Sequence, residues 1–97
     1  MLQDFRHNHV MPAKKPPKAS AEYRVAFARR LESARVAAGY ETMRDFSKEL
    51  GVSEATYRRW EAAETEPNIF HLQKISRLTG VSLDILISGQ RRTLLAS

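Results

Sequence analysis

The sequence predicts an all-α domain in which five short helices pack around one core. Apolar residues recur three or four positions apart in several segments, which is the spacing of one helix face. These segments open on residues that cap helix N-termini, and three of them end at a glycine. The chain has 97 residues and no cysteine, so a single small core without disulfide bonds is expected.

The first helix is predicted from a Ser20 cap to Ala38, and Gly39 ends it. Its core-facing residues are spaced by four, four, three and four positions: Tyr23, Phe27, Leu31, Ala34 and Ala38. A two-residue link then leads into the central part of the chain.

Residues 42–61 read as two short helices separated by a sharp turn. Thr42 is the expected cap of the first helix, with Asp45 placed to complete a capping box, and Phe46 and Leu50 share one face. Gly51 stands where a helix ends in left-handed geometry, which a residue without Cβ adopts most easily. The spacing therefore predicts a helix-turn-helix.

The second helix of this pair is expected to begin at a Ser53 cap, with Val52 and Tyr57 stapled across it. Tyr57 and Trp60 then face inward. The outer side carries the following residues: Glu54, Ala55, Arg58 and Arg59. A solvated charged face and a ligand-binding face both fit this pattern.

Several short matches in one order resemble the lambda-repressor-like domain of the Cro/C1 (xenobiotic-response-element) transcriptional regulators. They are Arg30-Leu31, Ala34-Arg35, Gly51-Val-Ser53, Trp60-Glu61 and Gly80-Val-Ser-Leu-Asp84, and the resemblance covers roughly Tyr23 to Gly89. It implies a sequence-specific regulator that binds double-stranded DNA. We expect a bacterial or phage repressor that binds an inverted-repeat operator as a homodimer.

The resemblance also implies roles for individual residues. Glu54, Ala55 and Arg59 are expected to read bases, and Arg35 and Glu61 to form a structural ion pair. The residues expected to lie near the DNA backbone are Thr42, Met43, Ser53, Thr56 and Arg58. An arginine can donate two hydrogen bonds to guanine, a glutamate can accept from cytosine, and alanine can touch the thymine methyl group. The chain departs from the family at Met43, where many relatives have glutamine, and in the acidic loop residues Glu64 and Glu66.

The last two helices are predicted from about Ile69 to Thr79 and after a Ser82 cap. Their expected core residues are Leu72, Ile75 and Leu78 or Thr79, followed by Leu83, Leu86 and Ile87. Ile85 is left over and, with Leu94 and Leu95, is expected to form a dimer interface. A tail that folds back on its own domain is the alternative.

Charge and composition complete the prediction. The expected parts are a flexible basic arm over residues 1–20, the helix-turn-helix domain over 21–89 and a short basic and apolar tail over 90–97. The net charge is +5, yet residues 21–90 carry ten basic and ten acidic side chains, so the excess lies in the two ends.

No motif for catalysis, a metal ion, a cofactor or a small-molecule substrate is found, and His71 is expected to have no acid-base role. No apolar run approaches the roughly 20 residues of a membrane span. We therefore expect a non-enzymatic cytoplasmic protein. The second hypothesis is a helix-turn-helix that binds another protein, such as an antitoxin or an anti-repressor partner, and the neutral domain with its acidic loop favours it.

Overall fold

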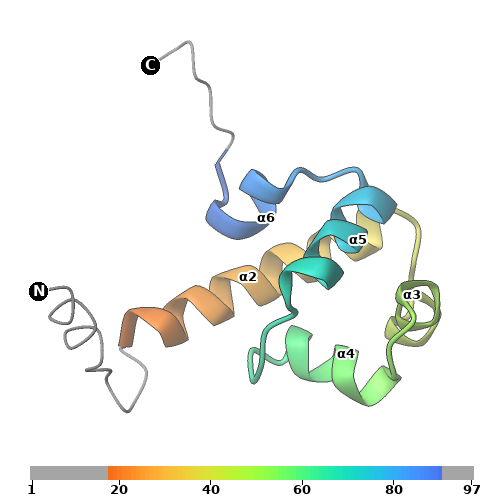
Figure 1. Ribbon diagram of the computed structural model, residues 1–97, viewed down its shortest axis with the longest axis horizontal. Coiled ribbons are helices and arrows are strands. Elements are labelled where there is room, and N and C mark those ends of the chain that lie inside the picture. Colours follow the sequence, from red (N-terminus) through yellow and green to blue (C-terminus); the bar gives the residue numbers. More distant parts are fainter. Residues whose placement is uncertain (1–17, 91–97) are drawn as a thin grey trace, which may run out of the picture.

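The computed structural model describes residues 18–90, which form five helices and no strand (Figure 1). In order they are α2 (Lys18–Ala37), α3 (Met43–Leu50), α4 (Glu54–Glu61), α5 (Ile69–Thr79) and α6 (Leu83–Ser88). The predicted all-α, five-helix fold is confirmed. The greater part of the expected N-terminal arm, and Leu94 and Leu95 of the tail, lie outside the described residues.

The long helix α2 packs against α4, α5 and α6, and α3 packs against α4 and α5 (Figure 1). It begins at Lys18, directly after the Pro16-Pro17 pair in the sequence. The expected N-cap at Ser20 is therefore wrong, because Ser20 lies inside the helix. Proline is common at helix starts, because N–H groups there have no acceptor inside the helix and a residue without an N–H loses no hydrogen bond. Thus α2 includes the last three residues of the segment expected as an arm.

One buried cluster holds all five helices together. It consists of Phe27, Leu31 and Ala34 from α2, Phe46 and Leu50 from α3, Tyr57 and Trp60 from α4, Ile75 from α5 and Leu86 from α6. The ring of Tyr57 lies edge-on to Phe46 at 5.5 Å and to Trp60 at 5.7 Å between centroids. Such aromatic pairs contribute about 0.5–1.5 kcal/mol beyond their buried area. The core therefore positions α4 on both α3 and the rest of the domain.

Three of the helices begin at the caps that the sequence predicts, Thr42, Ser53 and Ser82, and α5 begins at an Asn68 cap. The side chains of Thr42, Ser53, Asn68 and Ser82 each accept a hydrogen bond from the backbone N–H three residues later. Each bond satisfies an N–H that has no partner inside its helix, and replacing such a cap by alanine typically costs about 1 kcal/mol. The short helices thus have fixed starting points.

The core face of α6 differs from the prediction at Ile87. Leu86 is fully buried, whereas Ile87 is 36% exposed and does not complete the core. Arg30 of α2 explains the difference, because its guanidinium donates to the carbonyl oxygens of Leu86 at 2.8 Å and Ile87 at 2.9 Å. These bonds fix the end of α6 on α2 and leave the Ile87 side chain at the surface.

Candidate nucleic-acid interface

The turn between α3 and α4 sets the geometry of the site. Gly51 has φ +79°, in the left-handed region, and its N–H donates to the carbonyl oxygen of Lys48 at 3.1 Å. Val52 N–H then donates to Ser47 at 3.1 Å, and Ser53 caps α4. A residue with a Cβ would be strained at this φ. The turn therefore allows the Ser53 cap to follow the αL glycine by two residues and α4 to begin by three.

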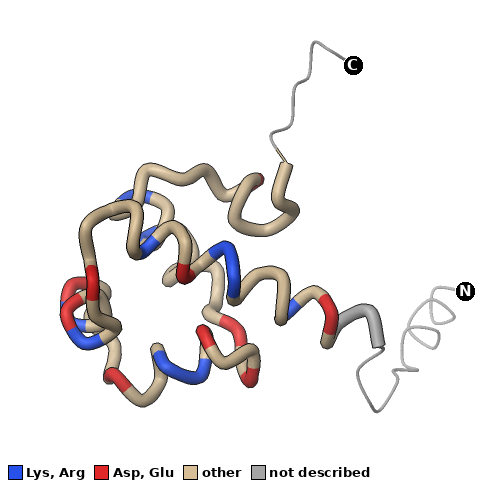
Figure 2. The backbone as a smooth tube through the Cα atoms, turned by 180° about the vertical axis from the view of Figure 1, so that it is seen from behind, with Lys and Arg blue, Asp and Glu red and all other residues tan. Residues whose placement is uncertain are grey.

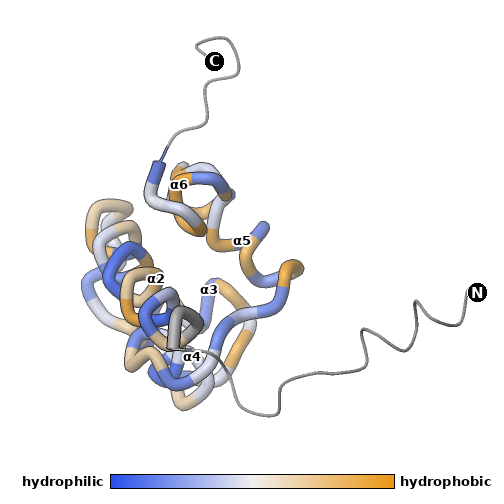
Figure 3. Tube along the Cα trace, turned by 90° about the vertical axis from the view of Figure 1, so that its left-hand side faces the viewer, coloured by the Kyte–Doolittle hydropathy of each residue, from blue (hydrophilic) through white to orange (hydrophobic). Residues whose placement is uncertain are grey.

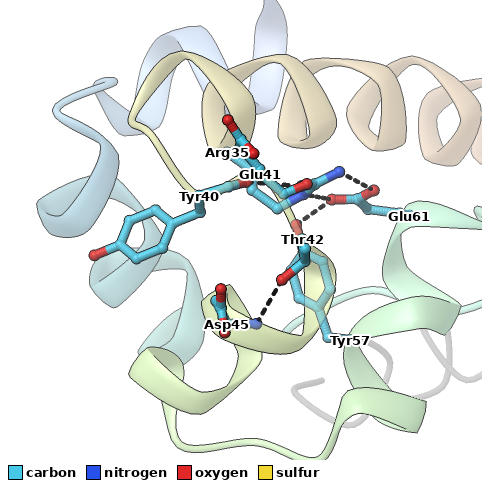
Figure 4. Close-up of polar contacts among 7 residues, drawn as sticks. All are labelled: Arg35, Tyr40, Glu41, Thr42, Asp45, Tyr57 and Glu61. Atoms are coloured by element: carbon cyan, nitrogen blue, oxygen red, sulfur yellow. Dashed lines mark hydrogen bonds and ion pairs between the residues drawn. The ribbon is translucent and has the colours of Figure 1, made fainter.

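A buried polar network braces the far end of α4 (Figure 4). Arg35 of α2 is 5% exposed, and its Nε donates to Oε2 of Glu61 at 2.8 Å. Its Nη1 donates to the carbonyl oxygens of Tyr40 and Glu41, both at 2.8 Å, and the Tyr57 hydroxyl donates to the Glu61 carboxylate. The expected pair between Arg35 and Glu61 is thus present. It ties α2, the link to α3 and the end of α4 together.

The network also shifts two pKa values. The hydrogen bond from Arg35 to Glu61 raises the pKa of the guanidinium, so Arg35 stays charged despite its burial. Burial, followed by the hydrogen bond to Glu61, raises the pKa of the Tyr57 hydroxyl well above its ordinary value of 10.0. Tyr57 therefore acts as a neutral donor, and the sequence prediction missed this role because it treated Tyr57 as a core residue only.

The outer face of α4 presents the residues expected to read bases. Ala55, Arg58 and Arg59 are exposed, and Glu54 is partly exposed. Glu54 and Arg58 form an ion pair at 2.6 Å across one helical turn. Within residues 21–90, no carboxylate lies within ion-pair distance of Arg59. Arg59 therefore offers a cationic fork to a partner, whereas Arg58 must first leave Glu54.

Breaking the exposed Glu54–Arg58 pair costs little. Pairs of this spacing contribute about 0.2–0.5 kcal/mol, since water screens both charges. The pair consequently holds the two side chains in place without preventing either from contacting a ligand.

The residues expected near the DNA backbone differ in how far their side chains are already engaged within the domain. The Thr42 oxygen accepts from Asp45 N–H at 3.1 Å, and Ser53 Oγ both accepts from Thr56 N–H and donates to Thr56 Oγ1, each at 3.0 Å. Thr42 and Ser53 are therefore already engaged as caps, whereas the Thr56 hydroxyl only accepts from Ser53. Met43 is partly buried against the core. Of this set, Arg58 is the charged side chain that faces solvent.

The loop after α4 is held on α2 by Arg24. The Arg24 Nε donates to the carbonyl oxygen of Ala63 at 3.3 Å, and its guanidinium lies 3.7 Å from the carboxylate of Glu66. The repulsion that Glu66 would exert on a phosphate is therefore partly offset. Glu64 is exposed and shares a hollow on the outer face of α4 with Ala55, Arg58, Arg59 and Ala62.

Ala63 in this loop has φ +64° and is the one residue other than glycine with positive φ among residues 18–90. A left-handed conformation costs an L-residue roughly 1–2 kcal/mol. The adjoining hydrogen bonds, from Ala63 N–H to Trp60 and from Glu64 N–H to Arg59, close the end of α4 around it. The loop contacts of Arg24 and the strain at Ala63 were both absent from the sequence prediction.

Ile85, expected at a dimer interface, is partly buried. With Ala34, Ala37 and Val81 it lines an open hollow of about 380 Å³ between α2 and α6. The two leucines expected to join it at that interface lie outside the described part of the chain.

His71, for which no catalytic role is expected, is partly buried, and its ring centroid lies 5.4 Å from that of Trp60. Its Nδ1 is buried without a hydrogen-bond partner. In the region from Lys18 to Gln90 no three His, Asp or Glu side chains gather as metal ligands. No helix in that region is long and apolar enough to cross a membrane.

Comparison with known proteins agrees with this geometry. A family model described as helix-turn-helix matches residues 31–86. One similar protein is the SPbeta prophage-derived uncharacterized HTH-type transcriptional regulator YonR of Bacillus subtilis (strain 168), 37% identical over 65 residues, which are 65% of this chain and 57% of YonR. Another is an uncharacterized HTH-type transcriptional regulator of Haemophilus influenzae, 37% identical over 46 residues, 47% of this chain and 19% of that protein. No solved structure matches.

Proposed function

Because the chain belongs to the Cro/C1-type helix-turn-helix family of DNA-binding transcriptional regulators, we propose that it reads DNA sequence with the outer face of α4. One observation carries the proposal: Arg59 is exposed beside Ala55 on a helix whose two ends are fixed by the Gly51 turn and by the Glu61 brace. A rigid helix of this kind fits the major groove of B-DNA.

Each outer residue then has a defined task. Arg59 donates to O6 and N7 of a guanine, Ala55 contacts a thymine methyl group and Glu54 accepts from N4 of a cytosine. Arg58 moves from Glu54 to a phosphate. Thr56 offers its hydroxyl at the backbone, while Thr42, Met43 and Ser53 act there chiefly by placing the N-termini of α3 and α4, whose free N–H groups attract phosphate.

We further propose that two copies bind one operator. Contacts through Ile85, Leu94 and Leu95 would place two recognition helices one DNA turn apart, roughly 34–36 Å, and so require an inverted repeat. Such a dimer over a promoter represses transcription by excluding polymerase. In this proposal the protein works in the cytoplasm, without catalysis and without a small-molecule ligand.

Binding of another protein is the second candidate. The exposed apolar pair Ile69 and Phe70, each 62% exposed, together with the zero balance of charge over residues 21–90, favours it. A protein interface of this kind does not depend on phosphate neutralisation.

A salt titration separates the two functions. Fluorescence anisotropy of labelled duplex DNA is followed with purified full-length protein between about 50 and 200 mM salt. Groove binding predicts that log affinity falls linearly with log salt, with a slope of about −0.9 for each phosphate neutralised. Absence of duplex binding even at the lowest salt would contradict DNA reading and favour the protein-binding function.

A further inference from the structure

Two adjacent apolar side chains at the start of α5 lack a covering surface. Ile69 and Phe70 are the most exposed of the large hydrophobic residues in the described part of the chain, at 62% each. Figure 3 shows this hydrophobic stretch at the beginning of α5, where the loop from α4 ends. A contiguous exposed apolar pair is typical of a contact surface. We call it the Ile69–Phe70 patch.

An acidic segment precedes the patch. Residues 60–73 contain three glutamates and no lysine or arginine, and Figure 2 shows the acidic positions of this loop. Glu61 is neutralised by Arg35 and Glu66 is partly offset by Arg24, 3.7 Å away. Glu64 is exposed and has no basic group within ion-pair distance in residues 21–90. We call residues 62–68 the acidic loop; it would attract a cationic segment.

The N-terminal segment joins the fold near this loop. The first half of α2 lies against the acidic loop, since Arg24 contacts both Ala63 and Glu66. Lys18, where α2 begins, precedes Arg24 by six residues, which is about 9 Å along a helix axis. An extended chain spans at most about 3.3–3.6 Å per residue, so Lys14 can lie up to about 14 Å from Lys18. The segment before Lys18 can therefore reach the acidic loop.

The composition of that segment complements the surface. Residues 1–17 carry three basic side chains and one acidic side chain, and one apolar pair among them, Val10-Met11, precedes Lys14-Lys15. This order matches a patch that adjoins an acidic loop. A tether of this length also gives a local concentration in the millimolar range, so the chain's own segment has an advantage over a free peptide.

We propose that residues 10–15 dock on the acidic loop and the Ile69–Phe70 patch of the same chain. Lys14 and Lys15 lie beside Glu64 and Glu66, and Val10 and Met11 cover the two exposed apolar side chains. The docked lysines neutralise the negative charge of Glu64 and Glu66 in the acidic loop that adjoins the outer face of α4. This contact forms without DNA, so its test is independent of the proposed DNA reading.

The test places a paramagnetic label on the N-terminal segment. The chain has no native cysteine, so Ala13→Cys gives a single attachment site for a nitroxide. In full-length protein without DNA, the amide relaxation enhancement is expected to be strongest between Glu64 and Phe70 and weak at Lys48 of α3. High salt should reduce it, because the screening length falls from about 8 Å at physiological ionic strength to about 3 Å at 1 M.

Matched variants then identify the contact. The enhancement should fall several-fold in a Glu64→Gln/Glu66→Gln variant and in an Ile69→Ser/Phe70→Ser variant, all four positions being exposed. A Glu41→Gln/Glu49→Gln variant removes the same charge from exposed positions elsewhere and should leave it unchanged.

Two results would overturn the proposal. One is an enhancement that is spread evenly over the domain or is insensitive to both surface variants. The other is transfer of the enhancement between molecules when isotope-labelled protein without nitroxide is mixed with unlabelled protein carrying it, because a second copy would then be the occupant.

Discussion

Replacing Arg35 by alanine should destabilise the domain more than any surface change. The substitution leaves the Glu61 carboxylate, whose side chain is 8% exposed, without its cationic partner. It also removes the donor to the carbonyl oxygens of Tyr40 and Glu41. Only the Tyr57 hydroxyl would still donate to the carboxylate.

The expected loss follows from this burial. Breaking a buried ion pair by removing one partner costs about 3–5 kcal/mol, because the remaining charge is uncompensated. In a domain of 60–100 residues each kcal/mol shifts Tm by roughly 4–8 °C, so Tm should fall by about 12–40 °C. Replacing both Arg35 and Glu61 by methionine removes the stranded charge and should recover much of the loss.

Urea unfolding followed by circular dichroism measures these free energies. Arg29→Ala is the matched control, since Arg29 lies on the exposed side of the same helix and should change stability by less than about 0.5 kcal/mol. If Arg35→Ala stayed within 1 kcal/mol of wild type, the brace would not be a major determinant of the fold.

Three further perturbations test other parts of the structure. Because the pKa of Tyr57 is raised in the folded state, the unfolded chain loses the hydroxyl proton first as pH rises. The stabilisation that the Tyr57 hydroxyl contributes is therefore complete below pH 10 and declines above it, by up to about 1.4 kcal/mol per pH unit. In alkaline unfolding titrations the stability of the Tyr57→Phe variant should accordingly fall less steeply than that of wild type. Ala63→Gly should raise the free energy of unfolding by about 0.5–1 kcal/mol in urea, because glycine tolerates the left-handed φ, whereas Gly51→Ala should lower it; a loss for Ala63→Gly would contradict the strain assigned there. In duplex binding assays Arg59→Ala should relax preference at one base pair by about 1–3 kcal/mol. Arg58→Ala should instead weaken binding to all duplexes alike and reduce the salt slope by about one. Equal losses of affinity for specific and random DNA from both variants would refute the two roles.

The sequence was sufficient for features that depend on neighbouring residues. Thr42, Ser53 and Ser82 were identified as caps because a cap hydrogen bond joins residues three positions apart. Gly51 was identified because a left-handed turn restricts the residue type. Ser20 was wrongly predicted as an N-cap, because serine is also tolerated inside a helix. The neighbouring residues do not indicate which of these two positions Ser20 occupies.

Features that depend on contacts between distant segments were missed. Ile87 has the spacing of a core residue, yet hydrogen bonds from Arg30, 57 residues away, fix α6 with that side chain outward. Arg24, 42 positions before Glu66 in the sequence, lies 3.7 Å from the Glu66 carboxylate and partly offsets its charge. The pairing of Arg35 with Glu61 was expected only through a family resemblance, since nothing local links residues 26 positions apart.

In the candidate site, too, features set by neighbouring residues were predicted and features set by side-chain contacts were not. Exposure of Ala55, Arg58 and Arg59 could be predicted from helical spacing, because Tyr57 and Trp60 fix the buried side of α4. The pairing of Glu54 with Arg58 was compatible with the sequence but depends on rotamers. It leaves Arg59 as the arginine of this face without a carboxylate partner in the region from Ala21 to Gln90.

The most direct test of sequence reading is selection of binding sites from a random duplex library by the full-length protein at physiological salt. Screening at that ionic strength leaves little purely non-specific attraction. We predict enrichment of an inverted repeat with half-sites about one helical turn apart, and loss of one base preference in the Arg59→Ala selection. A library that remains unenriched after repeated rounds would contradict the assignment of α4 as a reader of DNA sequence.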